Sequence, residues 1–295
     1  MPMILPKLTV TAPAKLNIHL AVLDRRKDGF HNIESVFFAL NFGDTLHFEL
    51  VSGENTAEIT MEGLNFSLPV EKNIIFQALS LFRAKTGFPE GLKIMVEKSI
   101  PIGGGLGGGS SDAAAALLAL NRLAGSPLSR EVLLEMGASL GSDVPFFLYR
   151  TPAAWVTGRG ERVTPIKAPF LYFVLVNPGF PSDTAAAFRL LDKYREGRNE
   201  FTTMSQTATL PQEPAEWTFS NDFLPVFEER EKSVYSGLIS QLRELGADFA
   251  GLSGAGSTCF GVFKEQKCAE KAAASLRDKW NFVESCRSGV FSEER

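Results

Sequence analysis

One short segment constrains the fold of this chain more than any other. Six of the seven residues from Gly103 to Gly109 are glycine, and Ser110-Ser-Asp112 then leads into an alanine-rich stretch typical of a helix. Glycine permits positive φ and close backbone approach to a ligand, and so many glycines would cost too much conformational entropy for a mere turn. The start of the following helix offers unpaired N–H groups and a positive dipole end. The segment therefore predicts a strand–loop–helix unit that binds phosphate.

Two familiar phosphate loops fit this segment poorly. A Walker A motif requires a lysine directly after the last glycine, and the first lysine after this loop is Lys167. The spacing Gly103-x-Gly105-x-x-Gly108 formally matches the dinucleotide fingerprint, but so glycine-rich a run matches it by chance. That fingerprint also expects an acidic residue at the end of a second strand, and the next acidic residues fall on a predicted helix. A Walker-type nucleotidase is excluded, and a hydride-transfer enzyme is disfavoured.

Composition limits the class of protein. The chain has 295 residues, 44% of them hydrophobic and 22% charged, with a formal net charge of -4. These values exclude disordered, collagenous and coiled-coil chains. The chain also lacks the excess of basic residues that a non-specific nucleic-acid binder needs. No apolar run approaches the roughly 20 residues that span a bilayer, and the N-terminus has no signal pattern. The three cysteines lack metal-ligand spacing. From these observations together we expect a cytoplasmic protein that binds neither nucleic acid nor membrane.

The periodicity of apolar residues predicts two α+β domains. In the first half we expect strands at 7–11, 16–23, 33–40, 45–51, 57–61 and 92–97, and helices at 73–85, 111–123 and 129–139. We also expect a turn at Gly43-Asp44 and a strand or loop at 144–149. A composition change with prolines at 165 and 169 places the domain boundary, which gives domains 1–165 and 166–295.

The second half alternates strands with helices. Strands are expected at 171–176, 249–253, 258–263 and 282–286, and helices at 184–193, 234–245 and 267–280. The polar stretch 196–216 predicts a disordered loop.

Two charged residues are candidates for chemistry. Lys15 lies in an apolar strand, so its ammonium must reach a polar partner, and the alternative is an exposed strand face. Asn17, two residues on, shares that face. Asp143 stands between a helix end and apolar residues, where it is either a cap or a catalytic carboxylate. A lysine and an aspartate that meet at a γ-phosphate would form a phosphoryl-transfer site, with the carboxylate accepting the hydroxyl proton.

Two further loops have both a structural and a functional interpretation. Asp28-Gly-Phe-His31 is a polar turn in which Phe30 either packs on a strand or stacks on a planar ligand. Gly251-Leu-Ser-Gly-Ala-Gly-Ser-Thr258 joins two short strands, either as a simple hairpin or as a second close approach to an anion.

Together these motifs resemble the GHMP kinase superfamily, the small-molecule kinases of galactose, homoserine, mevalonate and phosphomevalonate. Pro13-Ala-Lys-Leu-Asn17, the central glycine segment and the C-terminal glycine loop occur in the order of that superfamily. The segments Arg26–His31, Leu140–Phe147 and Asn221-Asp222 resemble the branch whose acceptor is a cytidine-diphospho sugar alcohol. The resemblance covers the chain from about residue 12 to the last strand.

The resemblance implies a fold and an activity. It implies an ATP-binding N-terminal domain with a left-handed β-α-β unit, and a ferredoxin-like C-terminal domain that contacts substrate. It also implies transfer of the ATP γ-phosphate, with Mg²⁺, to the 2-hydroxyl of the sugar alcohol in non-mevalonate isoprenoid synthesis. We expect a monomer or a homodimer.

The resemblance also assigns residues. Lys15 and Asp143 correspond to the catalytic pair, and Asn17, Phe30, His31 and Thr184 to substrate contacts. The implied ATP site comprises Asn73, Pro101, Ile102, Gly103, Gly104, Gly105, Leu106, Gly107, Gly108, Gly109, Ser110 and Ser111. Position 30 is usually tyrosine, so stacking is retained here without a hydroxyl contact, and the acidic Pro181-Ser-Asp183 is a departure beside Thr184. The rivals are a GHMP kinase with another acceptor and a non-catalytic ligand sensor, which would be expected to lose Lys15 and Asp143.

Overall fold

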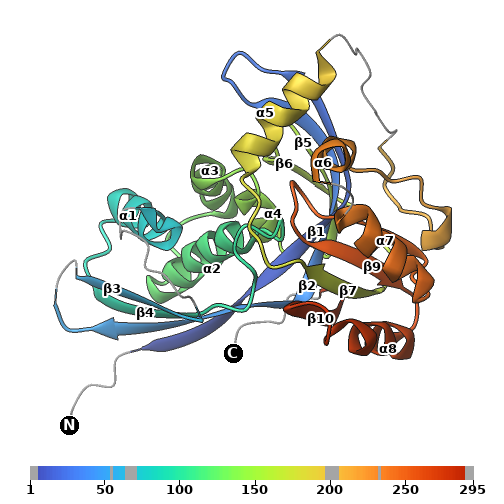
Figure 1. Cartoon of the computed structure of the whole chain (residues 1–295). Helices are drawn as coiled ribbons and strands as arrows, with labels where there is room; N and C mark the ends of the chain where they lie inside the picture. Colours follow the sequence, from blue (N-terminus) through green and yellow to red (C-terminus); the bar gives the residue numbers. More distant parts are fainter. Residues whose placement is uncertain (1–5, 54–55, 64–71, 197–205, 232–233, 290–295) are drawn as a thin grey trace.

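The structure, a computed structural model, describes residues 6–53, 56–63, 72–196, 206–231 and 234–289. Two β-sheets with attached helices form its framework (Figure 1). The strands of the first sheet lie between residues 7 and 165, and those of the second lie between residues 172 and 287. The described chain is therefore α+β, as the periodicity predicts.

The first sheet is built on two long antiparallel strands, β1 (Lys7–Arg25) and β2 (His31–Val51). Its order is β3-β4-β2-β5-β6, with β1 paired to β2. The shorter strands are β3 (Ala57–Glu62), β4 (Gly91–Glu97), β5 (Ala153–Thr157) and β6 (Arg162–Pro165). Strands β3 and β4 are parallel and flank helix α1 (Ile74–Thr86), which makes a β-α-β unit. The sequence did not predict β5 and β6.

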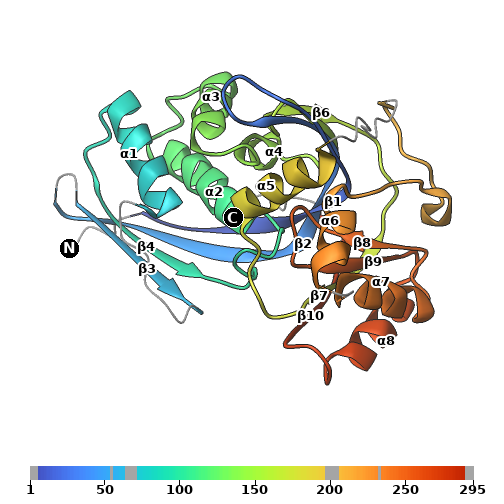
Figure 2. The ribbon, with the colours of Figure 1, turned by 45° about the horizontal axis from the view of Figure 1, so that its top comes forward.

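Four helices cover one face of this sheet (Figure 2). They are α1, α2 (Gly108–Leu123), α3 (Arg130–Leu140) and α4 (Val144–Tyr149). Alanines such as Ala113 and Ala116 are fully buried in the core beneath them. Their small side chains let the backbone of α2 approach the sheet closely, which fixes where the glycine segment ahead of it begins.

Two local predictions for the first half are wrong. Gly43-Asp44 is not a turn, because β2 continues through it and pairs Gly43 with Pro13. A Cβ at Gly43 would lie 2.2 Å from the Ala12 carbonyl oxygen, so this glycine permits close strand contact instead. Residues 144–149 form helix α4 rather than strand or loop. Pro145 suits the first helical turn, and the apolar run that follows has no polar positions to reveal a helical period.

The second sheet has the antiparallel order β10-β7-β9-β8 expected of a ferredoxin-like domain. Its strands are β7 (Tyr172–Asn177), β8 (Phe249–Leu252), β9 (Cys259–Phe263) and β10 (Phe282–Arg287). The connecting helices are α5 (Thr184–Arg195), α6 (Phe223–Glu231), α7 (Val234–Glu244) and α8 (Gln266–Leu276). Helix α6 is a further element that the sequence did not predict.

The expectation of a disordered loop at 196–216 is wrong for part of that stretch. Residues 197–205 lie outside the described residues, but 206–216 are ordered against the first sheet and end in a 3₁₀ turn, Pro214–Glu216. The indole N–H of Trp155 donates to the Thr207 carbonyl at 2.8 Å, and Leu210 is buried. Backbone pairing of Lys167 with Ala208 and Leu210 supplies the order that the polar composition does not suggest.

A shared apolar core joins the two sheets. Leu16 of β1 and Phe38 of β2 lie in one buried cluster with Phe173 of β7 and Phe260 of β9. Strand β1 therefore belongs structurally to both halves of the chain. None of the helices in the described ranges is long and apolar enough to cross a membrane.

Candidate active site

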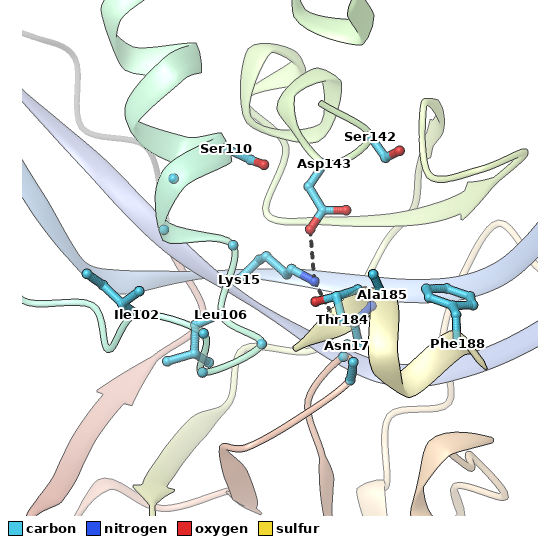
Figure 3. Close-up of a pocket in the computed structure, with 18 of the residues that line it drawn as sticks. Lys15, Asn17, Ile102, Leu106, Ser110, Ser142, Asp143, Thr184, Ala185 and Phe188 are labelled. Atoms are coloured by element: carbon cyan, nitrogen blue, oxygen red, sulfur yellow. Dashed lines mark hydrogen bonds and ion pairs between the residues drawn. The ribbon is translucent and has the colours of Figure 1, made fainter. Parts of the chain in front are cut away.

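A cavity of about 970 Å³ opens between the glycine segment, β1, the β1–β2 hairpin and helix α5. Side chains from distant parts of the sequence face this space (Figure 3). Every residue that the sequence assigns to catalysis, ATP or substrate lines it, except Ser111.

Lys15 and Asp143 meet in this cavity. Lys15 Nζ lies 3.1 Å from Asp143 Oδ2, and the lysine side chain is only 5% exposed. The ammonium also donates to Asn17 Oδ1 and lies 4.4 Å from the centre of the Phe37 ring. Asp143 precedes α4 but makes no capping hydrogen bond with its side chain, which leaves its carboxylate directed at the ammonium (Figure 3). The lysine is therefore not on an exposed strand face, and Asp143 occupies the N-cap position of α4 without a side-chain capping bond.

Asn17 connects this pair to the loops around it. Its amide nitrogen donates to Ser35 Oγ at 3.0 Å, and its backbone N–H donates to Ser253 Oγ at 3.2 Å. The Ser253 hydroxyl in turn donates to the Gly105 carbonyl at 2.9 Å. Asn17 thus fixes the position of the Lys15 ammonium relative to the glycine segment.

The glycine segment leads directly into an uncapped helix. Gly103, Gly105 and Gly107 all have positive φ, and a Cβ at Gly105 would lie 2.1 Å from the Ser253 carbonyl oxygen. Helix α2 begins at Gly108, three residues earlier than the sequence predicts, and Gly107 as its N-cap supplies no side-chain hydrogen bond. The first N–H groups of the helix therefore lack helical partners beside the cavity, as an anion site requires.

The two serines after the glycines differ in position. Ser110 lines the cavity. Ser111 belongs to the first turn of α2 and is buried. Its hydroxyl has no hydrogen-bond partner among the described residues. Ser111 and Asp112 are therefore not helix caps.

A buried charge cluster lies beneath the glycine segment. Lys98 Nζ contacts Asp44 Oδ2 and Asp112 Oδ2, the latter at 2.6 Å, and all three side chains are nearly inaccessible. Asp44 Oδ1 also accepts the N–H groups of Ser99 and Ile100, at 2.6 and 2.9 Å. The cluster thus ties the end of β4 to the first turns of α2 and holds the glycine segment between them.

The charged groups of this cluster shift the pKa values of Asp112 and Lys98. Burial, opposed by the Lys98 ammonium and reinforced by the nearby Asp44 carboxylate, raises the pKa of Asp112 to about 7. Burial alone would lower the pKa of Lys98, but the two carboxylates outweigh it and raise that pKa.

The opposite end of the cavity is aromatic. Phe30 is 49% exposed at the tip of the β1–β2 hairpin, and the Arg159 guanidinium lies 5.0 Å from its ring centre. Phe188 of α5 stacks on the imidazole of His31, with centroids 5.1 Å apart and planes 17° apart. Thr184 begins α5 and lines the cavity. Phe30 is thus held out toward the cavity rather than folded onto the sheet.

The other two loops of interest support the site. Asn73 caps α1, where its Oδ1 accepts the Ile75 N–H at 3.0 Å. The second glycine loop packs against the first, since the Thr258 N–H donates to the Gly104 carbonyl at 3.1 Å. The hydroxyls of Ser257 and Thr258 are engaged by the Asn177 amide, so only Gly254 and Ala255 of that loop face the cavity.

Comparison with known proteins agrees with this geometry. Residues 73–151 match the GHMP kinases N terminal domain, and residues 216–281 match the GHMP kinases C terminal family. The 4-diphosphocytidyl-2-C-methyl-D-erythritol kinase of Xanthomonas axonopodis pv. citri is 38% identical over 268 residues, covering 90% of this chain and 85% of the relative. The kinase of the same name from Syntrophotalea carbinolica is 38% identical and covers 91% and 94% of the two chains.

The chain belongs to the family of 4-diphosphocytidyl-2-C-methyl-D-erythritol kinases. A crystal structure of a 4-(cytidine 5'-diphospho)-2C-methyl-D-erythritol kinase is 32% identical, with a TM-score of 0.78 over 96% of this chain and 100% of that chain. The homoserine kinase of Cytophaga hutchinsonii, at 18% identity and a TM-score of 0.70, shares the fold. As a GHMP kinase, this member of the family is a small-molecule kinase with ATP as its co-substrate.

Several cavity residues of this kinase were not found from its sequence. Phe188 and Asp192 lie one and two helical turns after Thr184, and that spacing could have indicated a common face. Arg159 stands between Gly158 and Gly160, both with positive φ, in a turn whose strands were also missed. Lys98 gave no signal, because nothing local distinguishes it from a surface lysine at the end of a strand.

Proposed function

We propose that this kinase transfers the γ-phosphate of ATP to the 2-hydroxyl of 4-diphosphocytidyl-2-C-methyl-D-erythritol. The products are the 2-phosphate and ADP, in non-mevalonate isoprenoid precursor synthesis. The observation that carries the proposal is the contact between Lys15 and Asp143, between a phosphate loop and an aromatic acceptor end. A ligand sensor has no need of such a pair.

Asp143 acts as the general base in this proposal. Its carboxylate accepts the proton of the acceptor hydroxyl as that oxygen forms a bond to the γ-phosphorus. The bond from the γ-phosphorus to the bridging oxygen breaks, and ADP leaves with the electron pair. The Lys15 ammonium stabilises the negative charge on the transferring group. Its burial strengthens this interaction, because little water is present to screen it.

The glycine segment holds the nucleotide. Ile102 to Ser110 bring backbone N–H groups and the start of α2 to the ATP phosphates, with Pro101 lining the same wall. Asn73 also lines the cavity, and in this proposal it lies near the adenine. Ser111 is buried in the first turn of α2 and does not line the cavity. In this proposal the domain 1–165 binds ATP, and the domain 166–295 completes the acceptor site through α5.

The residues also fit a magnesium ion that arrives with ATP. The described ranges contain no group of three or more His, Cys, Asp or Glu side chains that could hold a metal by themselves. The Ser110 hydroxyl projects from the start of α2 into the cavity (Figure 3), where such an oxygen would complete the coordination of phosphate-bound Mg²⁺. When bound, the ion would neutralise phosphate charge.

The aromatic end receives the cytidine. Phe30 offers an exposed ring face for stacking on a base, and His31 offers a ring nitrogen. Asn17 and Thr184 lie between the aromatic end and Lys15, where the sugar alcohol must be placed. We propose that the enzyme works in the cytoplasm as a monomer or a homodimer.

A coupled ADP-release assay across a panel of acceptors tests this function. The panel contains 4-diphosphocytidyl-2-C-methyl-D-erythritol, mevalonate, homoserine and galactose. We expect phosphorylation of the cytidine compound with a kcat/KM at least about a thousandfold above the others, because only it engages the aromatic end. Preference for an acceptor without a base would contradict the proposal.

A further inference from the structure

One hydrogen bond joins the β1–β2 hairpin to helix α5 at the acceptor end of the cavity. His31 Nε2 lies 2.7 Å from Asp192 Oδ1. An ionised carboxylate can only accept a hydrogen bond, so the proton of a neutral imidazole must be on Nε2. Nδ1 is then unprotonated and acts as an acceptor.

Nδ1 is the ring nitrogen left for a ligand. None of the described residues makes a hydrogen bond to Nδ1. Nδ1 is also not one of the fully buried atoms without a partner, so it is accessible from outside the protein. His31 lines the cavity, and stacking on Phe188 fixes the plane of its ring. The site therefore presents a fixed hydrogen-bond acceptor to whatever binds beside it.

We propose that Asp192 determines the base specificity of the acceptor site, by holding His31 in the tautomer that accepts a hydrogen bond from the 4-amino group of cytosine. This inference rests on the proposed function and adds a positioning residue to it. The 4-amino group is the N–H donor on the cytosine edge, whereas uracil carries a carbonyl oxygen at that position. A uracil base would place two acceptors against each other, and each would lack a donor.

Asp192 is not needed to hold α5 in place. Its side chain is 39% exposed, and the same helix is anchored independently at its end. There Arg195 contacts Asp222 at 2.7 Å and donates to the Val22 carbonyl at 2.6 Å. A variant at Asp192 should therefore fold normally and change the state of His31.

The test compares a cytidine-diphospho acceptor with its uridine analogue at pH 8, where an ordinary imidazole is neutral. We expect the wild type to prefer the cytidine compound, and Asp192→Asn to lower the ratio of the two kcat/KM values by about 10- to 100-fold. The amide can donate to Nε2, which allows the proton to move to Nδ1. The loss should appear in the acceptor KM, with kcat changed less than about threefold, because Asp192 contacts neither Lys15 nor Asp143.

Asp24→Asn is the matched control. Asp24 lies on the same hairpin, accepts from the Asn32 amide at 3.1 Å and does not line the cavity. The Asp24→Asn variant removes the same charge as Asp192→Asn. A long-range electrostatic effect would therefore lower the ratio of the two kcat/KM values in both variants. We expect the ratio of this control to equal that of the wild type.

Imidazole ¹⁵N chemical shifts give a readout that does not depend on activity. The chain has 3 histidines, which makes assignment by single substitutions practical. We expect His31 to carry its proton on Nε2 in the wild type and to gain the Nδ1–H form in Asp192→Asn. An unchanged tautomer or an unchanged specificity ratio in this variant would overturn the inference. A wild type that phosphorylates neither compound would instead contradict the proposed function, and titration with CDP and UDP would then measure base preference directly.

Discussion

At the scale of single residues, the site depends on charges that the fold has removed from water. Lys15 is buried in a strand, and Asp143 and Asn17 are the groups that satisfy its ammonium. An unpaired ammonium at such a position would be costly, so these contacts position the group and also make its burial possible. The catalytic assignment can be tested by removing one function at a time.

We expect Asp143→Asn to lower kcat by about 10²- to 10⁴-fold, because an amide cannot accept the hydroxyl proton. ATP binding should be retained, since the glycine segment is untouched. Steady-state kinetics and calorimetry on the same preparation measure both quantities. A folded variant with nearly normal kcat would remove Asp143 from the mechanism.

Phe30 provides a test of the acceptor end. Its ring is half exposed and sits under the Arg159 guanidinium, so Phe30→Ala should cost little stability. The variant should raise the KM for the cytidine acceptor by about 5- to 150-fold, which corresponds to 1–3 kcal/mol of base stacking. Phe30→Tyr is the control and should be almost neutral. A lower melting temperature with an unchanged acceptor KM would show that the ring only packs.

At the scale of elements, the loop–helix unit at Gly103–Leu123 combines two kinds of glycine. Gly105 has positive φ and touches the second glycine loop, so a side chain there would clash with the Ser253 carbonyl. Gly109 lies in the first turn of α2, and a Cβ there would meet only Ile74 Cγ2, at 3.9 Å. A side chain at position 109 is therefore tolerated by the protein but lies beside the cavity.

Gly109→Val should weaken ATP binding by more than about tenfold while the melting temperature stays within a few degrees. The added side chain would hinder the approach of phosphate to the helix N–H groups. Calorimetric titration with ATP measures the affinity. Gly105→Val is the contrasting variant and should fail to fold, and unchanged ATP affinity in Gly109→Val would place the phosphates elsewhere.

The buried cluster below this unit predicts a pH dependence of stability. The pKa of Asp112 is raised to about 7 in the folded protein, mainly by burial. Between about pH 4 and pH 7 the unfolded chain has lost this proton while the folded protein retains it, so stability falls as pH rises. Asp112→Asn should flatten the stability curve in this window. Urea unfolding at several pH values tests this, and identical pH slopes for both proteins would contradict it.

At the scale of the whole molecule, β1 joins the two halves through a shared apolar core. Leu16 is completely buried in a core that contains strands of both sheets. A division of the chain at residue 165 therefore separates the two sheets, but it cuts through the core that they share.

Leu16→Ala should lower the free energy of unfolding by about 2–5 kcal/mol and do so for both sheets together. Hydrogen exchange in increasing urea measures this, with β4 and β9 as reporters. We expect both strands to lose protection at the same urea concentration, shifted equally in the variant. Protection that persists in β9 after β4 has opened would show that the halves unfold separately.

The sequence by itself determined the local features. Apolar periodicity located most of the strands and helices to within a few residues but missed β5, β6 and α6. The glycine segment indicated the phosphate loop. These signals are local, because helix periods, caps and glycine freedom act over a few residues. They failed where tertiary context decides: Gly43 permits strand contact instead of a turn, and the apolar run of α4 has no amphipathic pattern.

Only the tertiary structure decided which residues meet. Lys15 and Asp143 are 128 positions apart, and His31 and Asp192 are 161 apart. Helix α2 packs against both β1 and α4, which brings the first pair together, and the approach of α5 to the hairpin creates the second contact. No local pattern encodes such a distance. The raised pKa of Asp112 likewise depends on tertiary structure, because it follows from burial and from the neighbouring Lys98 and Asp44.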